Sequence, residues 1–214
     1  FSGRDPREFL QELIARVQSH PLIQLLLPAE VVAASGFRGN FSSQIRLQSG
    51  EVLGVDHGAT IIATGGLEYR GTGAGLAIAA PGDDPRIVTQ RDLEERLAEE
   101  PAALRDVRTV VMVQCVTPPD HEYYCSRVCC TQAVRNARML KERNPAARIY
   151  VLYRDIRTYG FWETEYTRAR EAGVLFVHFD EETPPRVESR DGRLRVTLEE
   201  PNLHEPLNLS PDLL

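Results

Sequence analysis

The stretch that decides the fold is the middle of the chain, where VRTVVMV at 107–113, TQAVRNARMLKER at 131–143 and IYVLY at 149–153 follow one another. The first and last are short apolar runs, which is typical of strands buried on both faces of a sheet. The apolar residues of the middle stretch recur at helical spacing and fall on one face. This order of strand, helix and strand predicts a right-handed crossover between two parallel strands.

Toward the C-terminus, predicted helices and strands continue to alternate. A helix is predicted at 162–172 and a further apolar strand at 174–179. The residues 186–190 and 193–198 then flank Asp191-Gly192, a dipeptide that favours a tight β-hairpin turn. The fold class predicted is therefore α/β, with a Rossmann-like parallel sheet, helices, and additional antiparallel hairpin elements.

The N-terminal part has weaker but readable patterns. Asp5-Pro6 starts a helix that His20-Pro21 ends, and Thr89 is a plausible N-cap for a helix through about Glu99. Between them, strands are predicted at 23–27, 31–34, 41–47 and 58–63, the last running into Thr64-Gly65-Gly66.

The order of elements in 20–66 recurs in 173–214, where the final apolar residues read as the beginning of a strand. Two nucleotide-binding lobes of the kind found in flavin and pyridine-nucleotide reductases are built this way. We therefore expect parts of two lobes: a partial flavin-side lobe at 1–104, and a Rossmann-like lobe at 105–214 that carries the cysteines and is truncated at its C-terminus. Both ends are expected to be cut points within a larger polypeptide.

The charge and composition of the chain argue against some classes of binding partner. With 25 Lys and Arg against 31 Asp and Glu, the formal net charge of −6 argues against nucleic acid or an anionic membrane as the main partner. No run of about 18 apolar residues occurs, so no membrane span is predicted. All four cysteines fall within 115–130 of a core-forming chain, a distribution that indicates metal or redox chemistry in a reducing, cytoplasmic setting.

The cysteine spacing is Cys115-x9-Cys125-x3-Cys129-Cys130. Four thiolates are the usual ligand set of a [4Fe–4S] cluster. Zinc is less well matched, because structural zinc sites commonly use pairs of CxxC type and none is present. Buried, inert thiols or disulfides remain open as alternatives. The position between a strand and a helix favours the cluster, because a helix N-terminus stabilises thiolates.

The sequence around these cysteines resembles the A subunit of heterodisulfide reductase and its bacterial relatives. The resemblance rests on 113–116 (VQCV) and 125–130 (CSRVCC), and continues into 39–41, 63–66, 88–94, 139–145 and 153–157. It implies a thioredoxin-reductase-like flavoprotein with an added cubane, working in electron transfer or flavin-based bifurcation. The loop between Cys115 and Cys125 is shorter than the usual form of that family.

The same resemblance implies the cofactors and partners. Thr64 and Gly65 would approach FAD, which lies largely outside this fragment, and Cys115, Cys125, Cys129 and Cys130 would hold the cluster. Partners would be other subunits of a heterodisulfide-reductase-like complex or ferredoxin-like electron carriers, and a homodimer is compatible. No residue is assigned a catalytic role, and the isolated piece is expected to be inactive.

One motif is missing. No GxGxxG loop follows a first strand, and Gly71-x-Gly73-x-Gly75 is not followed by a clear helix. We therefore predict that the cysteines occupy the place where dinucleotide phosphates bind in related reductases. The alternatives are an NAD(P)H-dependent disulfide reductase domain and a zinc-stabilised interaction module.

Overall fold

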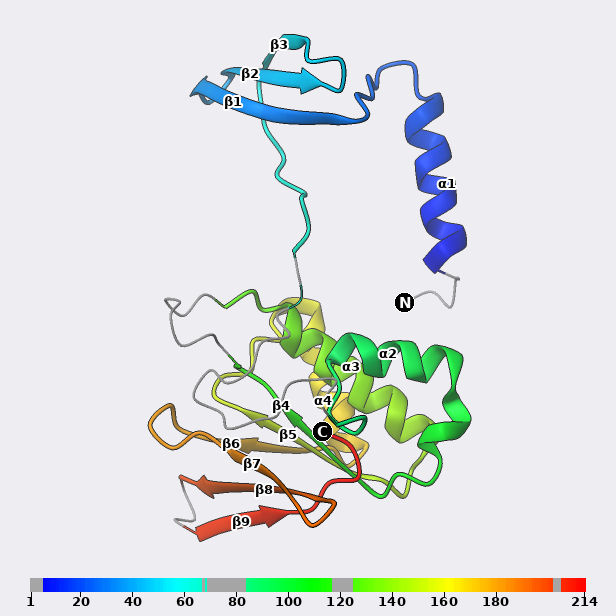
Figure 1. The fold of residues 1–214 in the computed structure, drawn as a ribbon, viewed down its shortest axis with the longest axis vertical. Helices are drawn as coiled ribbons and strands as arrows, with labels where there is room; N and C mark the ends of the chain where they lie inside the picture. Colours follow the sequence, from blue (N-terminus) through cyan, green and yellow to red (C-terminus); the bar gives the residue numbers. More distant parts are fainter. Residues whose placement is uncertain (1–5, 67, 69–83, 117–124, 202–204) are drawn as a thin grey trace. The chain divides into compact units, whose positions relative to one another are not determined.

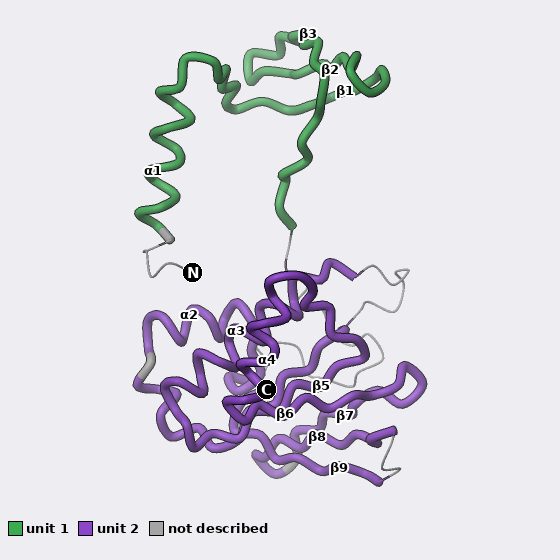
Figure 2. Tube along the Cα trace, turned by 180° about the vertical axis from the view of Figure 1, so that it is seen from behind, with its two compact units in different colours: residues 1–67 green, residues 68–214 purple. Residues whose placement is uncertain are grey.

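A computed structural model describes residues 6–66, 68, 84–116, 125–201 and 205–214 of the chain. The chain divides into two compact units, residues 1–67 and 68–214, coloured separately in Figure 2. The assignment of 1–104 to a flavin-side lobe and of 105–214 to a cluster-bearing lobe stays a prediction.

Unit 1 consists of a helix and an antiparallel meander. Helix α1 spans Pro6–Ser19, close to the predicted bounds. Strands β1 (Ala29–Phe37), β2 (Asn40–Leu47) and β3 (Val52–His57) pair in sequence order. The β1–β2 turn needs Gly36, which has φ of 104° and would place a Cβ only 2.1 Å from the Asn40 carbonyl oxygen.

Two predicted strands of unit 1 are wrong. The stretch 23–27 is not a strand, and the strand predicted at 58–63 lies beyond the end of β3 without ladder pairing among the described residues. Ile61 and Ile62 are 90% and 84% exposed. An apolar run becomes a strand only when a neighbouring strand accepts its backbone hydrogen bonds, and the described residues supply none.

Unit 2 contains the predicted parallel sheet. Strands β4 (Thr109–Val113), β5 (Arg148–Tyr153) and β6 (Leu175–His178) are parallel and adjacent in that order. Helix α3 (Val128–Arg143) connects the first two and α4 (Glu163–Glu171) the last two. Val110 lies opposite Ile149, so the central prediction of the fold is confirmed.

Helices cover one face of this sheet (Figure 1). Helix α2 (Gln90–Glu99) packs beside α3 and begins with a capping box, in which Thr89 and Asp92 exchange side-chain and backbone hydrogen bonds. Short 3₁₀ helices lie at Pro101–Leu104 and Gly160–Trp162. The core on this face is apolar and fully enclosed, and it includes Leu93, Leu97, Val110, Leu140, Ile149 and Val151.

A second antiparallel meander, β7 (Arg186–Arg190), β8 (Arg193–Glu200) and β9 (Glu205–Leu209), packs near the other face. Val111 and Leu152 point into a core cluster shared with Val196, Leu198 and Leu209. Because successive residues of a strand face opposite sides, Val110 and Val111 belong to different cores. The hairpin around Asp191-Gly192 is confirmed.

The last residues of the chain return to the parallel sheet. Leu213 forms a parallel bridge with Val110, and its carbonyl oxygen accepts from the Val111 N–H at 3.0 Å. The Val88 N–H donates to the carbonyl oxygen of Leu214 at 2.9 Å. The two meanders share the same strand order, in agreement with the internal echo seen in the sequence. None of the helices in the described ranges has the length and apolarity that crossing a bilayer requires.

Candidate functional site

The cysteines of the described ranges gather where β4 ends and α3 begins. Cys115 lies two residues beyond β4, and Cys129 and Cys130 lie in the first turn of α3. This helix begins at Val128, three residues earlier than the sequence indicated, so these two thiols are helical rather than part of a connecting turn. The carboxyl end of a parallel sheet is also where open α/β folds bind their ligands.

Backbone geometry at this site is unusual in two places. Cys115 and Arg127 have φ of 61° and 65°, in the left-handed region that residues other than glycine rarely adopt. Arg127 precedes α3 without a side-chain hydrogen bond that caps the helix. Such conformations persist when surrounding structure enforces them, and they often mark functional loops.

The thiols of Cys115 and Cys130 share an acceptor. Cys115 Sγ donates to the carbonyl oxygen of Asp155 at 3.7 Å, and Cys130 Sγ donates to the same oxygen at 3.8 Å. Asp155 follows β5, so the ends of two neighbouring strands and the start of a helix meet here. Cys130 is buried, whereas the other three cysteines are half-buried, and all four are free thiols.

The four thiols also act on one another. A hydrogen bond from Cys129 lowers the pKa of Cys130 to about 6, with help from the backbone N–H and the guanidinium of Arg157 and against burial and the Asp155 carboxylate. The same hydrogen bond raises the pKa of Cys129, as do burial and the nearby Cys130, Cys115 and Cys125. Cys129 therefore lies within electrostatic range of the other three cysteines, and the Cys129–Cys130 pair loses its first proton easily and its second with difficulty.

In the part of the chain that the structure describes, no group of three or more His, Cys, Asp and Glu side chains is arranged to hold a metal ion. The chemistry of the donor set still fits an iron–sulfur cluster. All four groups are soft thiols, the ligand type that such clusters take. A cubane distributes its ligands over separate irons, whereas zinc gathers four sulfurs about 2.3 Å from one ion.

Three charged or aromatic side chains of unit 2 lie in different environments. The Arg127 guanidinium lies over the Tyr159 ring, 5.5 Å from its centroid. Arg135, which could have offset charge at the cysteines, forms an ion pair with Glu94 at 3.2 Å. Trp162, at the start of the helix predicted at 162–172, is 43% exposed. The reason is that it ends a 3₁₀ turn ahead of α4 instead of occupying the inner face of that helix.

Several other residues with potential roles lie in unit 1 or outside the described residues. His57 is held in unit 1 by the carbonyl oxygen of Val55 and the hydroxyl of Thr60, at 3.2 and 2.8 Å. Thr64 and Gly65 follow in the unpaired segment after β3, and their flavin role stays a prediction. His121, Tyr123, Tyr124 and the glycines 71, 73 and 75 fall outside the described residues.

Sequence reasoning assigned no role to Asp155 and Arg157, although both fall in a motif that carries the family resemblance. A positional signal was available. Both follow directly after the second predicted strand, and the carboxyl ends of neighbouring parallel strands meet at one edge of the sheet.

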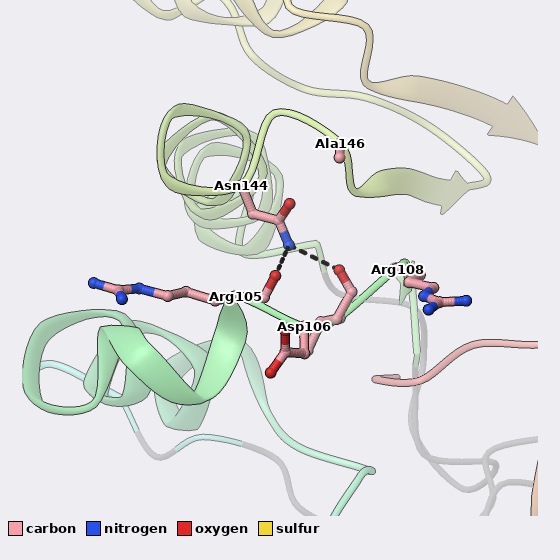
Figure 3. A pocket seen from close by; sticks show the side chains of 6 residues that line it. Arg105, Asp106, Arg108, Asn144 and Ala146 are labelled. Atoms are coloured by element: carbon pink, nitrogen blue, oxygen red, sulfur yellow. Dashed lines mark hydrogen bonds between the residues drawn. The ribbon is translucent and has the colours of Figure 1, made fainter.

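A depression of about 370 Å³ lies near the start of β4, away from the cysteines (Figure 3). Asn144, which lines this depression, has a structural role, because its side-chain amide donates to the carbonyl oxygens of Leu104, Arg105 and Val107. The side chains of Arg105 and Arg108 point away from each other, so they do not converge on a ligand.

By its fold and its thiols, the chain is an α/β protein with a cysteine group at the carboxyl end of a parallel sheet. Its curated relatives are A subunits of heterodisulfide reductase, and the family resemblance seen in the sequence is confirmed. One, the A subunit of the ferredoxin:CoB-CoM heterodisulfide reductase of Methanosarcina acetivorans, is 35% identical over 98 residues, covering 44% of this chain and 12% of the relative. No protein-family model matches the chain.

Two further relatives extend the comparison. The A subunit of the ferredoxin/F420H2-dependent CoB-CoM heterodisulfide reductase of M. acetivorans is 32% identical over 172 residues, covering 73% of this chain and 20% of the relative. The iron-sulfur A subunit of the CoB–CoM heterodisulfide reductase of Methanocaldococcus jannaschii is 42% identical over 73 residues, covering 32% and 11%. The chain thus spans at most a fifth of the length of these three relatives.

Solved structures similar to the chain include two flavoprotein-type enzymes. The bacillithiol disulfide reductase Bdr of Bacillus cereus gives a TM-score of 0.43 at 15% identity, covering 97% of this chain and 53% of that enzyme. The ornithine N-hydroxylase of Kutzneria sp. 744 gives 0.45 at 14% identity, covering 98% and 57%.

Proposed function

We propose that Cys115, Cys125, Cys129 and Cys130 hold a [4Fe–4S] cluster, and that the chain is the part of a heterodisulfide-reductase-A-like oxidoreductase that passes electrons through it. When bound, such a cluster supplies one-electron transfer. The observation that supports the proposal is that the sulfurs of Cys115, just after β4, and Cys130, in the first turn of α3, lie 3.7 and 3.8 Å from the same Asp155 carbonyl oxygen.

The roles of the protein residues follow from that placement. Cys130 is enclosed between α3 and the turn after β5, which excludes water from one side of the cluster. In the metal-free protein the Asp155 carbonyl oxygen accepts from the thiol of Cys115, and from that of Cys130 while Cys130 is protonated. Arg127, beside two of the ligands in sequence, is fixed over Tyr159.

The electron donor and acceptor belong to the same proposal. Thr64 and Gly65 would approach FAD in the intact protein, within a flavin-side lobe formed partly by 1–104. The cluster of 105–214 would exchange single electrons between this flavin and a partner iron–sulfur protein or a ferredoxin-like carrier, including other subunits of a heterodisulfide-reductase-like complex. All three relatives reported above carry the word ferredoxin or the term iron-sulfur in their names, which agrees with such partners.

Cluster content tests the proposal directly. Protein reconstituted without oxygen from ferrous iron and sulfide should hold about four iron and four sulfide per chain, because one cubane uses all four thiolates. Colorimetric iron and sulfide analysis, with zinc measured on the same sample, gives the answer. Stoichiometric zinc without sulfide would favour a zinc-stabilised module and contradict the cluster.

A further inference from the structure

The turn after β5 brings a charged pair against two of the cysteines. The Asp155 carbonyl oxygen lies 3.7 Å from Cys115 Sγ and 3.8 Å from Cys130 Sγ. Arg157, two residues on, donates a backbone hydrogen bond to Cys130. Its guanidinium Nε lies 2.6 Å from Asp155 Oδ2, so the two side chains form an ion pair beside these thiols.

We propose that Arg157 and Asp155 are positioning residues that set the reduction potential of the cluster at this site. This inference rests on the proposed function. Neither side chain would be a ligand, and both act through the electric field and through the hydrogen bonds made by their backbone at the sulfurs.

The physical reason is electrostatic. Reduction adds one electron and no atoms to a thiolate-bound cluster that is already negative, so a nearby positive charge favours the reduced form and a negative charge disfavours it. A hydrogen bond to a ligand sulfur also favours the reduced form, because it withdraws charge. Arg157 contributes both effects near Cys130, whereas the Asp155 carboxylate opposes them.

The ion pair makes the two residues compensate each other. With both present, the opposite charges of this ion pair act against each other at Cys130. Arg157→Gln leaves the carboxylate of Asp155 without its partner, and the midpoint potential should become more negative. Asp155→Asn leaves the guanidinium, and the potential should become more positive. The double variant should return close to the wild-type potential, because no uncompensated charge remains.

The test is a dithionite titration of the anaerobically reconstituted chain, followed by electron paramagnetic resonance. Iron and sulfide are measured first in every variant. The expected result is a shift of opposite sign for Arg157→Gln and Asp155→Asn at unchanged cluster content. Arg157→Lys, which keeps the charge, should lie nearer to wild type than Arg157→Gln. Arg108→Gln, near the other end of β4, should leave the potential unchanged.

Three outcomes decide the inference. Normal cluster content with equal potentials in all variants would overturn it and leave the proposed function standing. Shifts of the same sign in both single variants would show that the turn acts by shape and not by charge, and would also overturn it. Absence of iron and sulfide from the wild-type chain would overturn the proposed cluster and, with it, this inference.

Discussion

Cys130 shows how the chemistry of the site depends on single residues. Its side chain is 1% exposed, its sulfur meets the Asp155 carbonyl oxygen, and the Cys129 thiol donates to it. A buried thiol in apolar surroundings would resist ionisation, yet the pKa of Cys130 falls to about 6 because hydrogen bonds favour its thiolate. The thiolate is the form that binds metal, so this direction of the pKa shift agrees with the ligand role proposed for Cys130.

Single serine substitutions should separate ligands from neighbours. Serine at 115, 125, 129 or 130 should reduce cluster retention several-fold after desalting, because a hydroxyl is a harder and poorer ligand than a thiolate. Visible absorbance and sulfide content report the loss. Ser126→Ala, an exposed position between two of the cysteines, is the matched control and should retain the cluster. Equal retention in Cys115→Ser would remove Cys115 from the ligand set.

At the scale of elements, the helices of unit 2 differ in how they begin. Helix α2 starts with the reciprocal hydrogen bonds of Thr89 and Asp92, at 3.1 Å each, whereas α3 starts at Arg127 without a side-chain cap. The first backbone amides of α3 therefore lie in the turn that carries Cys129 and Cys130. An N-terminus left uncapped in this way is suited to negative charge.

Removal of the α2 cap should destabilise unit 2 measurably. Thr89→Ala loses the hydrogen bond to the Asp92 N–H, and loss of such a cap costs about 1 kcal/mol. Urea denaturation followed by the fluorescence of Trp162 reports on unit 2 alone, because this is the only tryptophan of the chain. Thr167→Ala, exposed within α4, should change the midpoint little. Equal midpoints for the two variants would contradict a stabilising role for the cap.

The elements that could be predicted are those whose sequence signals lie close to them along the chain. The Thr89 cap, the apolar face of α3, and the Asp191-Gly192 turn lie within a few residues of the structure that they determine. The first turn of α3 was missed because Val128, Cys129 and Cys130 carry no helix-start signal and Arg127 adopts a left-handed conformation. The convergence of Asp155 on Cys115 and Cys130 joins positions 25 and 40 residues apart, and no local pattern encodes it.

At the scale of the whole molecule, the two meanders are followed by different neighbours. After β9, Leu213 joins the parallel sheet through Val110 and closes the core of unit 2. After β3, the apolar residues Ile61 and Ile62 remain exposed, and no parallel sheet occurs among the described residues of unit 1. Among the described residues, the same order of elements thus yields an enclosed core in unit 2 and not in unit 1, because unit 2 contains the strands against which its final segment pairs.

This difference predicts that the chain by itself binds FAD weakly. Tight binding of a dinucleotide requires a strand, a glycine loop and a helix N-terminus to receive the pyrophosphate, and no GxGxxG loop follows a first strand in this sequence. Thr64 and Gly65 offer one short segment after β3 and little more. Equilibrium dialysis against FAD, with flavin absorbance measured after desalting, should find well below one flavin per chain. Thr64→Val should bind equally weakly, since one contact contributes little without the loop. A yellow protein with one flavin per chain would show that the chain holds the nucleotide without that loop, and loss of this flavin in Thr64→Val would identify the segment after β3 as the principal contact.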